Sequence, residues 1–283
     1  MSLTNRYPDS RQILWVALLA LPLVHFAVWP LARILSARAG LALAELSVTA
    51  VMAFFLRRRR LPAEEVLLLN AVPLATLVVA GLTALAASLV IAEVDLLQLD
   101  LLAALGWELP PVVQRAQLEV QLARDLPGLL AAVLTVAILP GICEELFFRG
   151  FAFSGLYAHH GPGVAVSGSA ALFAAAHMNP WQFTALLLFG LFLGLLVFWT
   201  HSIYPAILAH LVNNGMSLIA TNLRAYHGLE ILNPHLHLPG ALTVLAAGLA
   251  AAGLWWLSRQ PAVMPLPPSP DPALRGPGSS GPG

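Results

Sequence analysis

Long apolar segments follow one another along most of this chain. A bilayer core about 30 Å thick requires roughly 20 apolar residues per helix. Segments of suitable character occupy residues 13–34, 41–56, 66–92, 127–159, 163–178, 180–199, 202–220 and 240–257. The mean hydropathy is +0.80, and only 10% of the 283 residues are charged, which is unlike a soluble globular protein. The sequence therefore predicts an all-α, polytopic membrane helix bundle of about eight transmembrane helices, with the lipid bilayer as its surroundings.

Charge and cysteine content exclude several kinds of partner and site. The chain has 14 basic and 14 acidic residues, a formal net charge of zero, so nothing indicates a positively charged surface for nucleic acid, and we expect no nucleic-acid partner. Cys143 is the only cysteine. It excludes an intramolecular disulfide and any cluster of cysteine metal ligands.

Composition divides the chain into four parts. Residues 1–126 are expected to form N-terminal transmembrane helices and an elbow, and residues 127–220 a core that carries most of the unusual polar residues. Residues 221–258 add a loop and a last transmembrane helix, and the Pro/Gly-rich residues 259–283 are expected to be disordered. In the elbow, segment 93–126 mixes apolar and charged residues, which predicts either an amphipathic helix on the membrane surface or a solvated loop with a short helix.

A basic cluster indicates the orientation. Arg57-Arg58-Arg59-Arg60 adjoins the second apolar segment, and such clusters favour the cytoplasmic side. Counting spans from there places both termini in the cytoplasm and segment 93–126 outside, although Arg33, Arg38 and Arg224 then also lie outside. The prediction is a multi-pass protein of the cell membrane, the inner membrane in a bacterium.

Polar and ionisable residues inside the apolar segments are the candidate functional residues, because burying them in a membrane is costly. They gather in three places. The sequence GICEELFFRG contains Glu144, Glu145 and Arg149, LFAAAHMNP contains Phe173 and His177, and AILAHLVNNG contains His210, Asn213 and Asn214.

Spacing and depth predict that these groups meet. Glu145 and Arg149 are four residues apart with the acid first, the order that favours a helical ion pair. Gly161-Pro162-Gly163 breaks the helix between two apolar segments. At about 1.5 Å per residue, Glu144 and His177 both lie roughly 22–25 Å from this turn, so their side chains can meet across a hairpin.

The third motif lies at a similar depth. His210 and Asn214 share one helix face and lie roughly 14–20 Å from the next expected turn, at Thr200-His201. Asn213 is expected to be a packing or cavity residue.

Together, Glu144-Glu145-x-x-x-Arg149, Phe173-x-x-x-His177 and His210-x-x-x-Asn214 resemble the three ordered motifs of the CPBP family. This family contains the CAAX-processing type II endopeptidases and the bacteriocin-processing or Abi-type membrane proteins. The similarity covers residues 127–220, which would be a CPBP-like catalytic core. His201 departs from the pattern, where a glycine is expected.

The resemblance implies an intramembrane endopeptidase. Glu144 resembles the general base that activates a water molecule, and His177 would help to hold or deprotonate that water. His210 and Asn214 would donate hydrogen bonds to the oxyanion of the tetrahedral intermediate.

The remaining motif residues would support this centre. Glu145 and Arg149 resemble an orienting pair, and Phe173 is expected to pack the wall of the site. The implied substrate is a membrane-anchored protein or peptide, such as a C-terminal sorting or anchor segment, a leader peptide or a bacteriocin precursor. No cofactor is expected.

Three alternatives remain. Two histidines and a glutamate can bind zinc with a water in the fourth position, but there is no H-E-x-x-H helix motif, and the metal-free reading is preferred. A non-catalytic transporter or scaffold also buries Glu, His and Arg, but no inverted repeat is visible. A thiol protease using Cys143 is disfavoured, because a thiol in apolar surroundings is usually inert.

Overall fold

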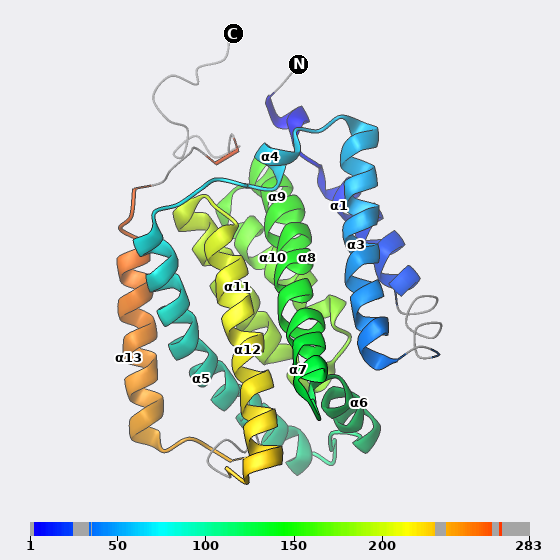
Figure 1. The fold of residues 1–283 in the computed structure, drawn as a ribbon. Helices are drawn as coiled ribbons and strands as arrows, with labels where there is room; N and C mark the ends of the chain where they lie inside the picture. Colours follow the sequence, from blue (N-terminus) through cyan, green and yellow to red (C-terminus); the bar gives the residue numbers. More distant parts are fainter. Residues whose placement is uncertain (1–2, 25–33, 35, 230–235, 262–265, 268–283) are drawn as a thin grey trace.

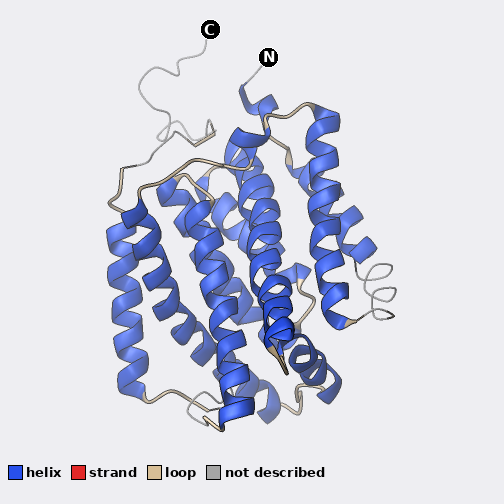
Figure 2. Ribbon diagram, in the orientation of Figure 1, coloured by secondary structure: helices blue, strands red, loops and turns tan. Residues whose placement is uncertain are grey.

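The computed structural model describes residues 3–24, 34, 36–229, 236–261 and 266–267. Within these residues all regular elements are helices and no strand occurs, as Figure 2 shows. Most of the long helices lie side by side in one bundle (Figure 1). The expectation of an all-α, multi-pass membrane protein is confirmed.

Five helical runs among the described residues are long and apolar enough to cross a membrane. They are α3 (Ala37–Arg59), α5 (Leu74–Ala104), Leu126–His160, Pro180–Thr200 and α13 (Gly240–Leu257). The apolar α10 (Pro162–Ala176) has only 15 residues, and the 24-residue α12 (Tyr204–His227) carries too many polar side chains to be counted with the five. Fewer helices than the expected eight therefore combine sufficient length with sufficient hydropathy.

The remaining elements are shorter or form parts of these runs. They are η1 (Leu3–Arg6), α1 (Ser10–Pro22), α4 (Ala63–Val66), α6 (Pro111–Gln121), α7 (Leu126–Ala132), η3 (Val133–Ile138), α8 (Leu139–Glu145), η4 (Leu146–Ala152), α9 (Phe153–His160), η5 (Pro180–Gln182) and α11 (Phe183–Thr200). Helix α1 covers the first part of the predicted span 13–34, whose residues 25–33 lie outside the described residues. Most of the tail 259–283 also lies outside the described residues.

The central run Leu126–His160 contains two wide π-helical turns, η3 and η4, which flank α8. Pro140 has no amide hydrogen to donate to the carbonyl of Val136, four residues earlier. The side-chain amide of Asn214 donates to that carbonyl instead, at 3.0 Å. Glu144 and Glu145 stand at the end of α8, between the two π turns, and such turns widen a helix and are frequent at functional sites.

The predicted span 66–92 was wrong at both ends, since α5 runs from Leu74 to Ala104. Its start is fixed by Pro73, which stands at the N-cap with extended ψ and favours an extended residue before it. The preceding residues pair with the turn between α11 and α12 instead of continuing a helix. The amide of Ile203 donates to the Leu68 carbonyl at 3.1 Å, and the side-chain amide of Asn70 donates to the His201 carbonyl at 2.7 Å.

The C-terminal part of α5 is stabilised by contacts with residues far along the chain. Its charged residues, which were expected to lie beyond the span in an amphipathic elbow or a solvated loop, have polar partners. His237, in the loop before α13, bonds Asp100 at 2.8 Å and Glu93 at 2.6 Å. The hydrogen bonds to Asp100 and Glu93 raise the pKa of His237 above its ordinary value. In the rest of segment 93–126, α6 is an 11-residue helix with no buried residue, and its position on the membrane surface stays a prediction.

His201, where a glycine was expected, adopts the backbone conformation that glycine favours. His201 caps α11 with φ +53°, in the left-handed region that glycine adopts most readily. The chain thus keeps the turn geometry with a histidine. The next helix begins directly afterwards, at Tyr204.

Packing within the bundle places the site. Helix α10 packs against α11, α12 against α5 and η3, and α3 against α8. Helix α5 also packs against α13, which forms one side of the molecule in Figure 1, while α1 and α3 form the opposite side. The run Leu126–His160 lies between them (Figure 1).

Candidate active site

A fully buried ion pair forms the base of the site. Arg149 Nη1 donates to Glu145 Oε1 at 3.1 Å, and neither side chain is exposed to solvent. Arg149 Nη2 also donates to the carbonyl of Gly190 on α11, at 3.2 Å. The predicted helical pair is therefore present, and it ties the π turn η4 to α11.

His210 links this pair to the rest of the site. Its Nδ1 lies 2.8 Å from Glu145 Oε1, the oxygen that also accepts from Arg149. A carboxylate accepts hydrogen bonds, so Nδ1 carries the hydrogen and Nε2 of a neutral ring is free. The His210 side chain is only 4% exposed, and its ring packs perpendicular to that of Phe189, with 5.3 Å between the ring centres.

His177 is oriented by its own helix. It caps the C-terminal end of α10, and its Nδ1 donates to the Phe173 carbonyl at 2.8 Å. Since a carbonyl oxygen only accepts, Nε2 of the neutral ring again has a free lone pair. This Nε2 faces Glu144.

Glu144 lies between the two histidines. Its Oε1 is 3.9 Å from His177 Nε2, and its Oε2 is 3.8 Å from His210 Nε2. These separations are too long for direct hydrogen bonds, and Oε2 is buried without a hydrogen-bond partner. The side chains of Glu144 and His177 are 16% and 30% exposed, so the site is open to its surroundings on this side.

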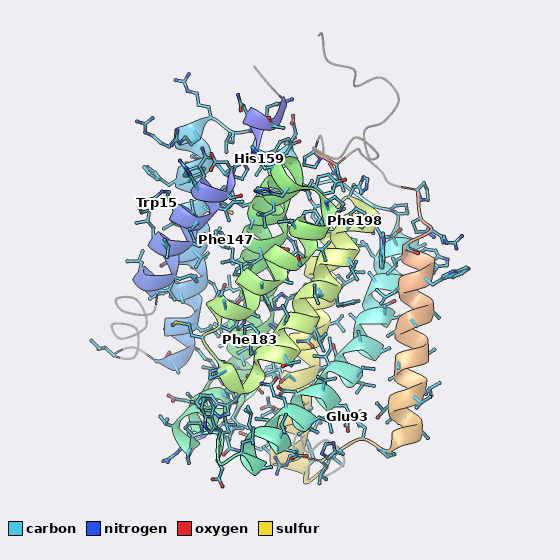
Figure 3. The ribbon with its side chains drawn as sticks, turned by 180° about the vertical axis from the view of Figure 1, so that it is seen from behind. Trp15, Glu93, Phe147, His159, Phe183 and Phe198 are labelled. Carbon is cyan, nitrogen blue, oxygen red and sulfur yellow. The ribbon has the colours of Figure 1, made fainter. Side chains whose placement is uncertain are left out.

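Phe173 packs against Arg149 of the buried ion pair and against the rings of both histidines. The Arg149 guanidinium lies over its ring at 4.3 Å from the centre. The ring centre of His177 lies 4.6 Å away, and that of His210 5.9 Å away. Figure 3 shows Phe147, three residues after Glu144, at mid-height in the bundle between His159 and Phe183.

The side chain of Asn214 forms hydrogen bonds with groups other than Glu144, His177 and His210. Its side-chain nitrogen donates to Val136 and its oxygen accepts from Asn213 at 3.1 Å. Asn213 in turn accepts from Ser88 of α5 at 2.9 Å, which fits the packing residue that was expected. One amide hydrogen of Asn214 is thus engaged with the backbone of η3, and its role as an oxyanion donor stays a prediction.

The segment after His177 is fastened to α5. Gln182 donates to Asp95 at 3.2 Å and accepts from Asn179 at 2.8 Å. Gln98 donates to the carbonyl of Pro180 at 2.8 Å. The C-terminal extension of α5 therefore fixes the chain immediately beyond the imidazole.

Glu45 was missed by the sequence reasoning. It lies in α3, is 8% exposed and adjoins Glu144. Its sequence signal was a lone carboxyl group inside the predicted span 41–56, which should have been treated like the other intramembrane charges.

The side chains do not form an evident metal site. Among the residues that the structure describes, no group of three or more His, Cys, Asp and Glu side chains is arranged to hold a metal ion.

A family match coincides with this geometry. Residues 126–216 match the family model of the Rce1-like type II CAAX prenyl endopeptidases. These residues are similar to the protease core of that family. The Rce1-like match includes every predicted site residue from Glu144 to Asn214 and leaves α3, with Glu45, outside. Searches of curated proteins and of solved structures found no match.

Proposed function

We propose that the chain is an intramembrane endopeptidase that hydrolyses a peptide bond of a membrane-anchored protein with water activated by Glu144. One observation carries the proposal: the buried, unpartnered Oε2 of Glu144 lies within 3.9 Å of an imidazole nitrogen, while its Oε1 lies equally near a second. A buried polar atom without a partner in a native structure requires an explanation. A reaction centre supplies one, because a carboxylate that activates water must not be fully occupied by other side chains.

The water would lie beside the line that joins Glu144 and His177. Two acceptors 3.9 Å apart are both within about 2.8 Å of a water placed to one side of them. The free Nε2 lone pair of His177 then accepts one hydrogen of the water, and Glu144 removes the other. The remaining hydroxide oxygen attacks the scissile carbonyl carbon.

The oxyanion that forms requires hydrogen-bond donors. His210 Nε2 can donate only when the ring is protonated, because Nδ1 already carries the hydrogen bonded to Glu145. In that state the negative charges of Glu144 and Glu145 are matched by the positive charges of His210 and Arg149, so the buried cluster has no net charge. The free amide hydrogen of Asn214 would be the second donor, as such donors typically contribute several kcal/mol to transition-state stabilisation.

The proton that Glu144 takes from water leaves again in the same reaction. When the C–N bond breaks, Glu144 passes this proton to the amine that departs. The carboxylate is thereby restored, and the products are a new carboxyl terminus and a new amino terminus. No other reactant is consumed.

The proposed reaction needs no metal. Cleavage by the purified protein should continue after extended treatment with a strong chelator, because protein side chains alone hold the water. Loss of cleavage that zinc restores would replace this part of the proposal with a zinc mechanism.

The proposed substrates are membrane-anchored proteins with C-terminal sorting or anchor segments, since the reactive groups lie among membrane-spanning helices. The test compares membrane-protein C-termini in cells that produce the wild type, Glu144→Gln or Glu119→Gln. Glu119 is an exposed acid on α6 and serves as the control. New C-termini should be absent with Glu144→Gln and present with the other two. Identical termini in all three would refute the proposal.

A further inference from the structure

A second carboxyl group lies at the site. Glu45 is the only acidic residue of the membrane-spanning α3, and it is 8% exposed. Helix α3 packs against α8, the helix that carries Glu144. It lies outside the Rce1-like match, so the family similarity does not account for this residue.

Among the residues that the structure describes, no cation forms an ion pair with Glu45. The ion pairs among the described residues assign the nearby cations and histidines to other acids: Arg149 to Glu145, His210 to Glu144 and Glu145, and His177 to Glu144. Glu45 instead adjoins the Glu144 carboxyl group, where α3 packs against α8.

A second contact between α3 and α8 lies beside Glu45 and Glu144. The Cys143 thiol lies next to Thr49, one helical turn after Glu45. The packing of α3 against α8 thus places Glu45 beside Glu144.

A hydrogen bond between two carboxyl groups requires one proton, because two carboxylates have no donor between them. Two buried carboxylates in contact also repel each other strongly, so that one of them is kept protonated. The local charges favour the same state. In the proposed mechanism Glu144 and Glu145 balance Arg149 and the protonated ring of His210, so an ionised Glu45 would leave an uncompensated buried charge.

We propose that Glu45 is a positioning residue, which keeps one proton and donates it in a hydrogen bond to the Glu144 carboxylate. This inference rests on the proposed role of Glu144 as the base. The hydrogen bond stabilises the ionised form of Glu144 and fixes the rotation of its carboxylate relative to the two histidines. A helix outside the Rce1-like core thereby sets the pH range in which the base works.

The pH dependence of cleavage distinguishes this role from simple packing. Other titratable or charged groups face the pair: His177 from α10, His210 from α12, and Cys143, Glu145 and Arg149 from the central run. They are unchanged in a Glu45 variant, so a displaced acid limb of kcat/KM reports on Glu45. A hydrogen bond to a charged group is equivalent to about one to two pH units.

The experiment uses the full-length protein in proteoliposomes with a membrane-anchored reporter peptide. Glu45→Gln keeps a donor and should leave the acid limb where the wild type has it. Glu45→Leu removes the donor and should move this limb upward by about one to two pH units. Thr49→Val, on the same face of α3, is the packing control and should not move it. If the acid limbs of Glu45→Leu and the wild type coincide, the inference is overturned.

A second measurement does not depend on activity. Infrared difference spectra at neutral pH should show that Glu45→Gln removes one protonated carboxyl group from the wild type, whereas the exposed Glu119→Gln removes none. No loss in Glu45→Gln would overturn the inference even if Glu45→Leu fails to fold. A fully active Glu144→Gln variant would instead refute the proposed function, while the infrared result would still decide the protonation of Glu45.

Discussion

The buried pair of Glu145 and Arg149 gives the most quantitative prediction. Arg149→Met removes the guanidinium but retains an unbranched apolar side chain of similar length. It leaves Glu145 bonded only to His210 and removes the donor to the carbonyl of Gly190. The variant therefore contains an incompletely compensated carboxylate in a place without solvent exposure.

The expected magnitude follows from this burial. Breaking one side of a buried ion pair costs about 3–5 kcal/mol of unfolding free energy. Glu145→Gln should cost a comparable amount, because it leaves the guanidinium without its carboxylate. In the double variant neither charge is present, and the amide oxygen introduced by Glu145→Gln still accepts from His210. The double variant should therefore be more stable than the sum of the two losses predicts, by at least about 2 kcal/mol.

The assay is reversible unfolding of the purified protein in bicelles, followed for the wild type, both single variants and the double variant. A coupling free energy of at least about 2 kcal/mol is expected from this cycle. If the two losses add to within about 0.5 kcal/mol, the reasoning is refuted, because the two groups would then be energetically independent.

Three further predictions concern the surroundings of the site. Gly190→Ala should lower the unfolding free energy by about 1–3 kcal/mol in the same assay, since the added Cβ would lie 3.0 Å from Ala170 on α10; an unchanged value would show that α10 and α11 separate freely. His237→Gln should flatten the pH dependence of the melting temperature. Because the pKa of His237 is raised in the folded protein, its contribution to stability is complete below about pH 6.5 and is lost as pH rises through the raised pKa. Wild-type and variant curves that stay parallel would contradict this. Asn214→Leu should lower the unfolding free energy by about 1–3 kcal/mol, because the Val136 carbonyl loses its donor; equal stabilities would show that the carbonyl finds another partner.

The general fold could be predicted because hydropathy depends only on local sequence. The α13 boundaries agree with the predicted 240–257, since an apolar run between polar segments determines them. The boundaries of α5 could not be obtained in this way. Its extension past residue 92 depends on partners far along the chain, such as His237 for Glu93 and Gln182 for Asp95.

The meeting of Glu144 and His177 could be predicted because the rise per residue of a helix is nearly constant. Distance from the Gly161-Pro162-Gly163 turn therefore gave the depth of both side chains. Rotation about the helix axis is not given by sequence, and two π turns alter it here. The bond from Asn214 to Val136 depends on this local geometry and on Pro140.

Glu45 shows a different limit. Its isolation in an apolar segment was visible in the sequence, but its partner lies about 100 residues away, on a helix whose packing against α3 sequence spacing does not give. Motif reasoning concentrates on the segments that carry motifs. A side chain supplied by another helix is therefore readily overlooked.

The central claim is that Glu144 activates water for peptide hydrolysis, and oxygen labelling tests it most directly. The purified wild type and Glu144→Gln proteins would be incubated in proteoliposomes with a membrane-anchored peptide in ¹⁸O water, and the products weighed by mass spectrometry. We expect one heavy oxygen in the new C-terminal carboxyl group with the wild type and no product with the variant. Equal amounts of labelled product from both proteins, or no cleavage of any membrane-anchored peptide by the wild type, would contradict the claim.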